Sequence, residues 1–164
     1  GVPISELLQS DIFNKLEMSR TAYVVALRAE DQPAPAVDGQ GKHFRYAYAT
    51  EGPGGLATTV DDLAKFDLAL LNEKLISRRA QLKLFTPRIS VEARKTQYAY
   101  GWYVYPERSV AYHDGNFSGY HTMNWLNTAR KQAIVLLANR HTDRIREITW
   151  QLDRALNGLA ATKL

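Results

Sequence analysis

The spacing of apolar residues changes at Gln97, and this change constrains the fold more than any other feature of the chain. Before it, apolar residues recur every three or four positions, as they do along one face of a helix. After it they alternate with polar residues, which predicts strands at residues 98–105, 109–113, 120–126 and 132–139. The turns between these strands span only residues 106–108, 114–119 and 127–131. Connections this short join antiparallel neighbours, so we expect a β-meander.

Four other segments have the apolar spacing of helices. The first covers residues 4–18, with Ser5 as its expected cap. The second follows Thr58 or Thr59 and continues to about residue 72, and the third covers residues 77–85, before Thr86-Pro87. The fourth is expected to open at Thr142 or Asp143 and to end near Gly158.

The last helix should pack on the meander. Its apolar stripe comprises Ile145, Ile148, Leu152, Leu156 and Leu159. The final strand contains the continuous apolar run AIVLLA at residues 133–138, so we expect both of its faces to be covered. The predicted fold class is therefore α+β, an antiparallel β-meander packed by helices. Residues 23–27 are expected to form a short strand and residues 32–42 a loop, and the absence of repeats and linkers predicts one domain over residues 1–164.

Composition excludes several classes of protein. The 164 residues contain no cysteine, which excludes disulfides, thiolate metal sites and a cysteine nucleophile. No window approaches the ~18 consecutive apolar residues that a membrane span requires. The net charge of +4 comes from scattered basic residues, whereas nucleic-acid binding favours a concentrated stripe. We therefore expect neither a membrane span nor a nucleic-acid partner.

Three further kinds of chemistry lack their motifs. The four histidines, His43, His113, His121 and His141, form no HExxH pair and join no carboxylate cluster, so no metal site or cofactor is expected. The GPGGLATT segment has no GxxxxGK[ST] pattern for phosphate. Ser118 is the fourth residue of GNFSG, whereas the Gly-x-Ser-x-Gly motif of a nucleophile elbow has serine in the third position. Ser118 also precedes a predicted strand rather than a helix, so we expect it to be a turn residue.

Five blocks, in order, nevertheless resemble the class C β-lactamase and penicillin-binding serine hydrolase family. GGLATTVDDLAKF resembles its GGL-x-[ST]-T-x-x-D-[LM]-A-x-F segment, and IFNKLEMSRT resembles I-F-x-P-L-G-M-x-x-T. YGWYV, HDGNFSGYHT and AIVLLANR resemble the Y-G-x-G-W, H-x-G-x-x-x-G and V-V-x-L-x-N blocks. The resemblance extends over nearly the whole chain and implies a β-lactamase/transpeptidase-like fold, present here in part.

The resemblance also implies roles for residues 113–116. His-x-Gly in this family stands on a strand beside the active serine, so His113 would orient substrate or tune the proton network. Asp114 and Gly115 would line the substrate, with glycine permitting close approach. The backbone N–H of Asn116 would donate one hydrogen bond to the oxyanion. The alternative is that His113 merely ends a strand.

The departures from the family pattern are larger than the match. None of the seven serines has a lysine three residues later, and no tyrosine has an asparagine two residues later. Family order places both missing motifs, Ser-x-x-Lys and Tyr-x-Asn, before IFNKLEM. Without a nucleophile and its base, covalent catalysis is lost, so we expect the chain alone to be inactive. Smaller departures are Asn14-Lys15 for x-Pro, Glu17 for glycine, and Tyr103 in the aromatic strand.

The resulting hypothesis is that this chain is the C-terminal portion of a serine hydrolase, which would cleave an amide or ester through an acyl-enzyme. β-Lactams, D-alanyl peptides and simple esters are all candidate substrates, and family members often work in the cell envelope or outside the cell. The alternative is a non-catalytic binding module on the same scaffold. In either case we expect the bare edge at residues 133–138 to be covered by a missing N-terminal segment, by another chain, by a swapped segment or by the first residues of this chain.

Overall fold

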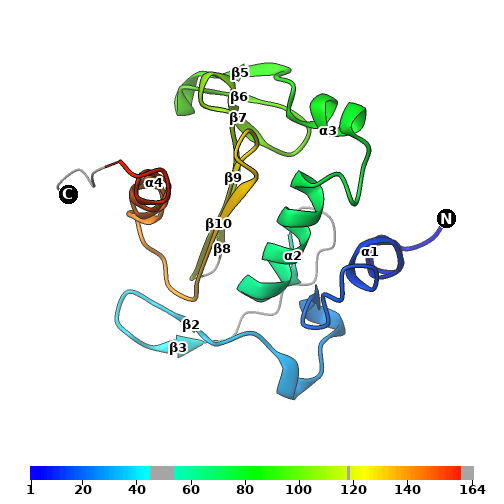
Figure 1. Cartoon of the computed structure of the whole chain (residues 1–164). Helices are drawn as coiled ribbons and strands as arrows, with labels where there is room; N and C mark the ends of the chain where they lie inside the picture. The colour runs from blue at the N-terminus through cyan, green and yellow to red at the C-terminus, as the bar shows by residue number, and fades with distance from the viewer. Residues whose placement is uncertain (45–53, 118, 160–164) are drawn as a thin grey trace.

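The structure is a computed structural model that describes residues 1–44, 54–117 and 119–159. A six-stranded antiparallel sheet forms its centre, with strands in the order β10-β9-β8-β7-β6-β5. Helix α2 (Val60–Leu71) covers one face of this sheet and helix α4 (Ile145–Leu156) covers the other (Figure 1). The layers and the antiparallel connections confirm the α+β prediction.

The meander contains two more turns than the sequence pattern predicts, because a strand before residue 97 was not expected and one expected strand is divided in two. Its strands are β5 (Ile89–Val91), β6 (Thr96–Tyr98), β7 (Tyr103–Tyr105), β8 (Val110–Phe117), β9 (Tyr120–Asn127) and β10 (Gln132–Ala138). The prediction of a single strand at residues 98–105 was wrong. The chain turns back at Gly101, whose φ of 79° suits glycine, and the Ala99 N–H donates to the Trp102 carbonyl across the turn at 2.8 Å.

Strand β8 is longer than expected. The sequence places a turn at residues 114–119, but β8 pairs with β9 through Phe117, which lies opposite Tyr120. Gly119, with φ of 84°, allows the tight reversal. Residues 113–117 therefore continue the strand rather than leave it. Ser118, expected to be a turn residue, lies outside the described residues.

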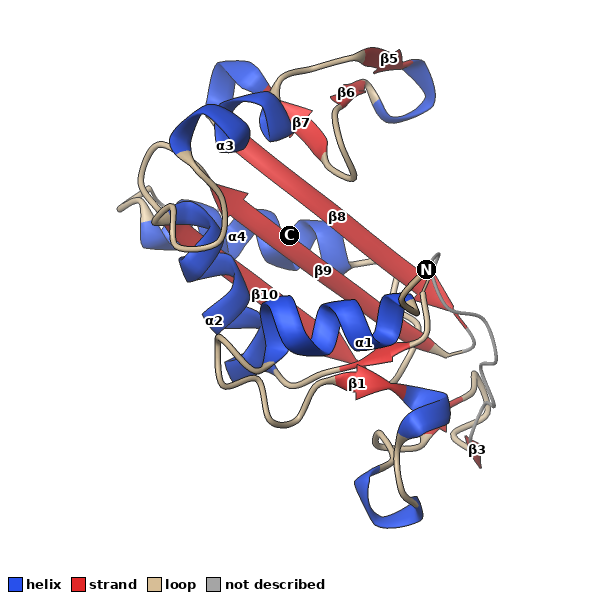
Figure 2. Cartoon of the chain, turned by 90° about the vertical axis from the view of Figure 1, so that its right-hand side faces the viewer, coloured by secondary structure: helices blue, strands red, loops and turns tan. Residues whose placement is uncertain are grey.

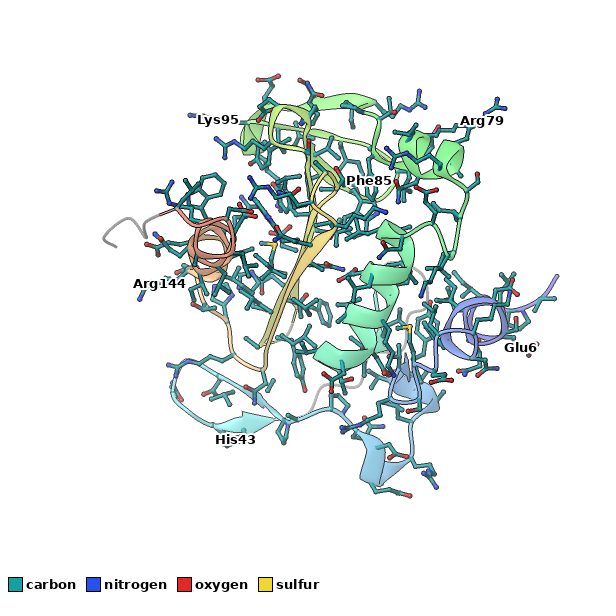
Figure 3. All side chains as sticks on the ribbon, viewed as in Figure 1. Glu6, His43, Arg79, Phe85, Lys95 and Arg144 are labelled. Atoms are coloured by element: carbon teal, nitrogen blue, oxygen red, sulfur yellow. The ribbon has the colours of Figure 1, made fainter. Side chains whose placement is uncertain are left out.

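The helices between residues 58 and 85 confirm their sequence signals. The Thr59 hydroxyl caps α2 by accepting a hydrogen bond from the Asp62 N–H at 3.2 Å. Ser77 caps α3 (Arg78–Phe85) in the same way through the Ala80 N–H, and α3 ends one residue before Thr86. In Figure 3 the labelled Phe85 points inward from α3, whereas Glu6, Arg79 and Lys95 stand at the periphery.

The first helix is shorter than expected. Helix α1 covers Ile4–Leu8 and continues as a π-helical turn, Gln9–Phe13, so the prediction of residues 4–18 was too long. Its N-cap is Pro3 without a side-chain hydrogen bond, so the assignment of Ser5 as a cap was also wrong. The chain reverses at Glu17, whose φ is 55°, the left-handed region in which glycine is favoured.

Residues 22–44 and 54–57 form small pieces of structure around the base of the sheet (Figure 2). The strand expected at residues 23–27 is only β1 (Ala22–Tyr23), paired with β4 (Leu56–Ala57) and followed by a 3-10 turn, Val24–Ala26. A second 3-10 turn spans Ala29–Asp31. The expected loop at residues 32–42 contains β2 (Ala36–Val37), which forms a hairpin with β3 (His43–Phe44).

Two cores lie on opposite faces of the sheet. The core beneath α2 contains Leu70, Leu71, Trp102, Ala111 and Leu126. The core beneath α4 contains Val110, Tyr112, Met123, Trp125 and Ile145. Because side chains alternate along a strand, this division assigns every residue of β8 and β9 to one face or the other.

The prediction that α4 packs on the sheet through its aliphatic stripe was largely wrong. Ile145 is buried as expected, but Ile148 and Leu152 are each 40% exposed and Leu156 is 55% exposed. Trp150 instead contacts Trp125, with ring centroids 6.2 Å apart. The helix therefore presents an aromatic side to the sheet and carries an aliphatic stripe on its outer side.

Candidate active site

The site that the sequence predicts lies where β8 extends past its neighbour. β7 begins at Tyr103, which pairs with Tyr112, so residues 113–116 of β8 have no strand partner on that side among the described residues. These residues contain the whole HDGN motif. The candidate site is therefore a strand edge without a paired strand among the described residues, which we call the β8 edge (residues 113–116).

Hydrogen bonding at the start of β8 decides which backbone groups point to this edge. The Thr128 N–H donates to the Ser109 carbonyl at 2.8 Å, so position 109 bonds toward β9. Successive residues of a strand direct their N–H and C=O groups to opposite sides. Positions 111, 113 and 115 therefore also bond toward β9, whereas the main-chain groups of Asp114 and Asn116 point to the β8 edge.

His113 lies on the α2 face of the strand, in sequence with Ala111, and is exposed. Its Nδ1 is 2.8 Å from the carbonyl oxygen of Asp114, a contact that requires Nδ1–H to donate. In the neutral ring this leaves Nε2 as an acceptor, and the Tyr98 hydroxyl lies 3.4 Å from it. The geometry thus presents an imidazole nitrogen able to accept a proton or a hydrogen bond.

The Tyr98 phenol was not among the residues predicted to form the site. Burial, followed by the neighbouring Tyr103, raises its pKa, so the hydroxyl stays protonated as a donor. Its ring also meets that of His113 at a centroid distance of 6.2 Å. The turn at Gly101 brings Tyr98 to this position, and the sequence pattern had merged the strands on either side of that turn.

Asp114 faces away from His113, on the α4 side of the sheet. Its carboxylate accepts from Arg94 Nη1 at 2.7 Å and from Arg146 Nη2 at 3.1 Å. Burial acts to raise the pKa of Asp114, but the hydrogen bonds and charges of Arg94 and Arg146 outweigh it and hold the pKa below its usual value. The side chain is therefore engaged within the protein, and only the main chain of Asp114 reaches the β8 edge.

Gly115 is required by close packing across the sheet. It lies opposite Thr122, and a Cβ at position 115 would be 2.7 Å from the Thr122 Oγ1. A side chain there would require Thr122 to change its conformation or β8 and β9 to separate. Glycine at this position thus permits the close contact with Thr122 on the α2 face beside His113.

Asn116 has its side chain on the α4 face and its N–H at the β8 edge. The Oδ1 atom lies 3.3 Å from His141 Nδ1, and His141 Nε2 is 3.0 Å from Asp143 Oδ1. The His141 ring stacks on the buried His121, with centroids 5.2 Å apart. These contacts fix the side chain of Asn116 without using its backbone N–H.

Two surface hollows of the chain lie elsewhere. One is bordered by Ser90, Thr96 and Pro106, the other by Gln81, Phe85 and Ala129, and His113 lines neither. Among the described residues there is also no cluster of three His, Cys, Asp or Glu residues suited to a metal ion. None of the helices that the structure describes has the length and apolar character needed to cross a membrane.

The sheet with helices on both faces and the HDGN strand at its free edge together define a β-lactamase-like fold. The model of the Beta-lactamase family matches residues 1–157, and the chain belongs to this family. It is 26% identical over 144 residues to PbpX of Bacillus subtilis strain 168, provisionally named a penicillin-binding protein, covering 85% of this chain and 35% of that protein.

Solved structures agree with this assignment. A penicillin-binding protein from Bacillus halodurans superposes with a TM-score of 0.78 at 22% identity, covering 95% of this chain and 50% of that one. A class C β-lactamase gives a TM-score of 0.74 at 17% identity, covering 99% of this chain and 53% of that one. The chain thus spans about half the length of these structures and about a third of its Bacillus subtilis relative.

Proposed function

We propose that this chain supplies the His-x-Gly strand of a serine hydrolase that transfers an acyl group from an amide or ester to water. The observation that supports this most directly is the β8 edge, where the N–H of Asn116 points away from β9, on the side where β8 has no strand partner among the described residues. A backbone N–H held in this way is the kind of donor that stabilises a developing oxyanion. In other acyl-transfer enzymes, loss of one such donor costs about 10²–10³ in rate.

In this proposal the substrate lies along the β8 edge as an added strand. The main chains of Asp114 and Asn116 bond its backbone, and Gly115 keeps the approach free of a side chain. His113 directs Nε2 toward the reacting centre, where it orients the substrate or accepts a proton. The names of the similar proteins, penicillin-binding protein and class C β-lactamase, favour β-lactams and D-alanyl peptides as substrates over simple esters.

The nucleophile is proposed to come from a segment outside this sequence, since neither Ser-x-x-Lys nor Tyr-x-Asn occurs in it. β10 offers one place for that segment, because within the described residues β10 pairs only with β9 along its length. Beyond the end of β10, Arg140 forms an isolated parallel bridge with Val37. The exposed aliphatic stripe of α4 (Ile148, Leu152 and Leu156) offers a second contact on the layer above β9 and β10.

The experiment compares the chain alone with the chain mixed with a candidate preceding segment that contains Ser-x-x-Lys. A chromogenic β-lactam and a nitrophenyl ester serve as substrates. We expect no turnover by the chain alone and turnover by the mixture that a serine-acylating agent blocks. Agent-sensitive turnover by the chain alone would refute the assignment of the nucleophile to another segment.

His113→Ala in the active mixture tests the site, with the exposed His43→Ala as the matched control. We expect His113→Ala to lower kcat/KM by about 10²-fold or more, as for loss of a group that acts in proton transfer, while His43→Ala leaves it unchanged. Equal activity of the two variants would remove His113 from the mechanism. If the mixture binds a labelled β-lactam but no acyl-enzyme forms, the alternative of a non-catalytic binding module is favoured instead.

Sedimentation tests the proposed contact at β10. The chain alone should self-associate through this apolar edge, and the added segment should convert it to a defined heterodimer. A stable, soluble monomer of the chain alone would contradict the proposal that this edge requires a partner.

A further inference from the structure

Helix α2 carries a carboxyl group into the core beneath it. Asp67 is 0% exposed and lies in the helix between Leu63 and Leu70. Its Oδ1 accepts a hydrogen bond from Asn124 Nδ2 at 2.8 Å. Asn124 stands on β9 directly opposite His113 of β8, and both side chains lie on the α2 face. The contact therefore joins the helix layer to the strand pair that carries the candidate site.

Two buried oxygen atoms of this contact have no donor. Asp67 Oδ2 and Asn124 Oδ1 are both enclosed and both lack a hydrogen-bond partner among the described residues. If Asp67 were ionised, both atoms could only accept, and each would remain unsatisfied in an apolar environment. A single proton on Asp67 Oδ2 changes this, because the resulting O–H can donate to an amide oxygen.

The surroundings favour the protonated form. Burial raises the pKa of Asp67 to about 7, and the hydrogen bond from Asn124 opposes this only in part. On the α2-facing sides of the described strands, the titratable groups are His113 of β8 and Tyr120 of β9, and β10 contributes none. On α2 itself, Asp62 and Lys65 pair with each other, with Nζ to Oδ1 at 2.9 Å. Among the described residues, no cation is recorded in contact with the Asp67 carboxyl.

We propose that Asp67 holds a proton in the folded chain and forms a two-bond acid–amide pair with Asn124. Asn124 Nδ2–H donates to Asp67 Oδ1, and Asp67 Oδ2–H donates to Asn124 Oδ1. This acid–amide pair fastens α2 to β9 behind His113, and it opens when the proton leaves. The inference is independent of the proposed hydrolase function, because it concerns the folding equilibrium of this chain.

Because folding changes the proton affinity of Asp67, the stability of the chain depends on pH. The folded chain binds this proton more tightly than the unfolded chain, whose aspartate has an ordinary pKa of 3.8. The stability that the proton confers is therefore complete at low pH and is lost as pH rises through about 7. Between these limits the unfolding equilibrium constant gains up to about tenfold per pH unit from this one group.

Asp67→Asn is the sharpest test, since it preserves shape and lets an amide–amide pair form without a titrating proton. Unfolding by denaturant should be measured for both proteins from pH 5 to pH 8. We expect the wild-type unfolding constant, divided by that of Asp67→Asn, to rise up to about tenfold per pH unit until near pH 7 and then to level off. A ratio that does not change with pH would overturn the proposal.

A second measurement needs no variant. The carboxyl carbon of Asp67, followed by NMR in the folded wild-type chain, should titrate near pH 7 rather than near the ordinary aspartate value. A carboxyl that is already ionised at pH 5.5 would overturn the proposal independently of any effect on folding.

Discussion

Gly115 and Thr122 face each other across β8 and β9 so closely that a Cβ on Gly115 would stand 2.7 Å from the Thr122 Oγ1. The backbone at Gly115 is extended, so space rather than dihedral freedom determines the residue. The contact explains in physical terms why the HDGN strand contains glycine, and it leads to the first prediction.

Gly115→Ala should lower the free energy of unfolding by about 1–3 kcal/mol, the usual cost of adding a methyl group to a packed site. Adding Thr122→Ala should recover part of this loss, because the clashing Oγ1 is removed. Gly39→Ala is the control, since a Cβ there meets nothing within 4 Å. Denaturant unfolding at neutral pH measures all four proteins, and a Gly115→Ala variant as stable as the wild type would contradict the packing argument.

Asp114→Asn should lower the free energy of unfolding at pH 7 by about 1.5–3 kcal/mol, because two charge-assisted hydrogen bonds from Arg94 and Arg146 are lost. The pKa of Asp114 is depressed in the folded chain, so this stability is present above the ordinary aspartate pKa and disappears as pH falls through the folded value. The difference between the two proteins should accordingly shrink below about pH 4. Asp11→Asn, at an exposed ion pair, should change little at any pH.

Asp62→Ala should be more damaging than Asp61→Ala, although the two residues are neighbours. The Asp62 carboxylate is buried and accepts from the Arg20 N–H at 2.8 Å, from Thr21 Oγ1 at 3.0 Å and from Lys65 Nζ at 2.9 Å. Its loss removes the acceptor of the Arg20 N–H and one partner of the Thr21 hydroxyl, which should cost about 1–3 kcal/mol. Asp61 is exposed, so its replacement should cost under about 1 kcal/mol, from the helix dipole. Thermal and denaturant unfolding would show equal losses if the Asp62 contacts were unimportant.

Glu17→Gly should raise the free energy of unfolding by about 0.5–1 kcal/mol. Glu17 occupies the left-handed region, with φ of 55°, at the position where the family pattern has glycine. Relief of that strain should exceed the entropy that glycine adds to the unfolded chain. Glu6→Gly, within α1, should have the opposite sign and cost about 1 kcal/mol. Destabilisation by Glu17→Gly would mean that the glutamate side chain makes a contact that outweighs the strain.

Leu152→Ser should leave the unfolding free energy of the isolated chain within about 0.5 kcal/mol, because Leu152 lies on the exposed side of α4. Ile145→Ala, on the buried side of the same helix, should cost about 2–5 kcal/mol. If the exposed stripe is a contact for a further segment, Leu152→Ser should instead weaken that association. A titration by fluorescence anisotropy would separate the two effects.

The sequence predicted the layers of this fold more successfully than the faces that its elements present. Period-two alternation located β8, β9 and β10 within a few residues, because each has one regular pattern and short turns. It missed the reversal at Gly101, since the residues on both sides continue the same alternation. For α4, the prediction of the buried face was based on the aliphatic residues alone. The helix is instead oriented by the packing of Trp150 and by a hydrogen bond from the Trp125 indole N–H to Asp153 at 3.3 Å.

The candidate site shows a similar division. The HDGN motif itself was visible in the sequence, but its ionic partners were not, because Arg94 and Arg146 reach Asp114 from segments 20 and 32 residues away. Asp67 had a detectable signal. It occupies a position of the apolar stripe in α2, between Leu63 and Leu70, and a lone carboxylate there indicates a buried polar contact. Its partner Asn124 could not be assigned without the register of the sheet.

The order of the six strands has a consequence for how the protein is assembled. From β5 to β10 each strand lies beside its neighbour in sequence, so every pairing closes a short stretch of chain. Low contact order of this kind favours fast folding. During synthesis the sheet can accordingly form by successive hairpin closure as soon as these residues leave the ribosome. Such a unit is well suited to split-enzyme complementation, in which a separately made polypeptide adds activity to a scaffold that has already folded.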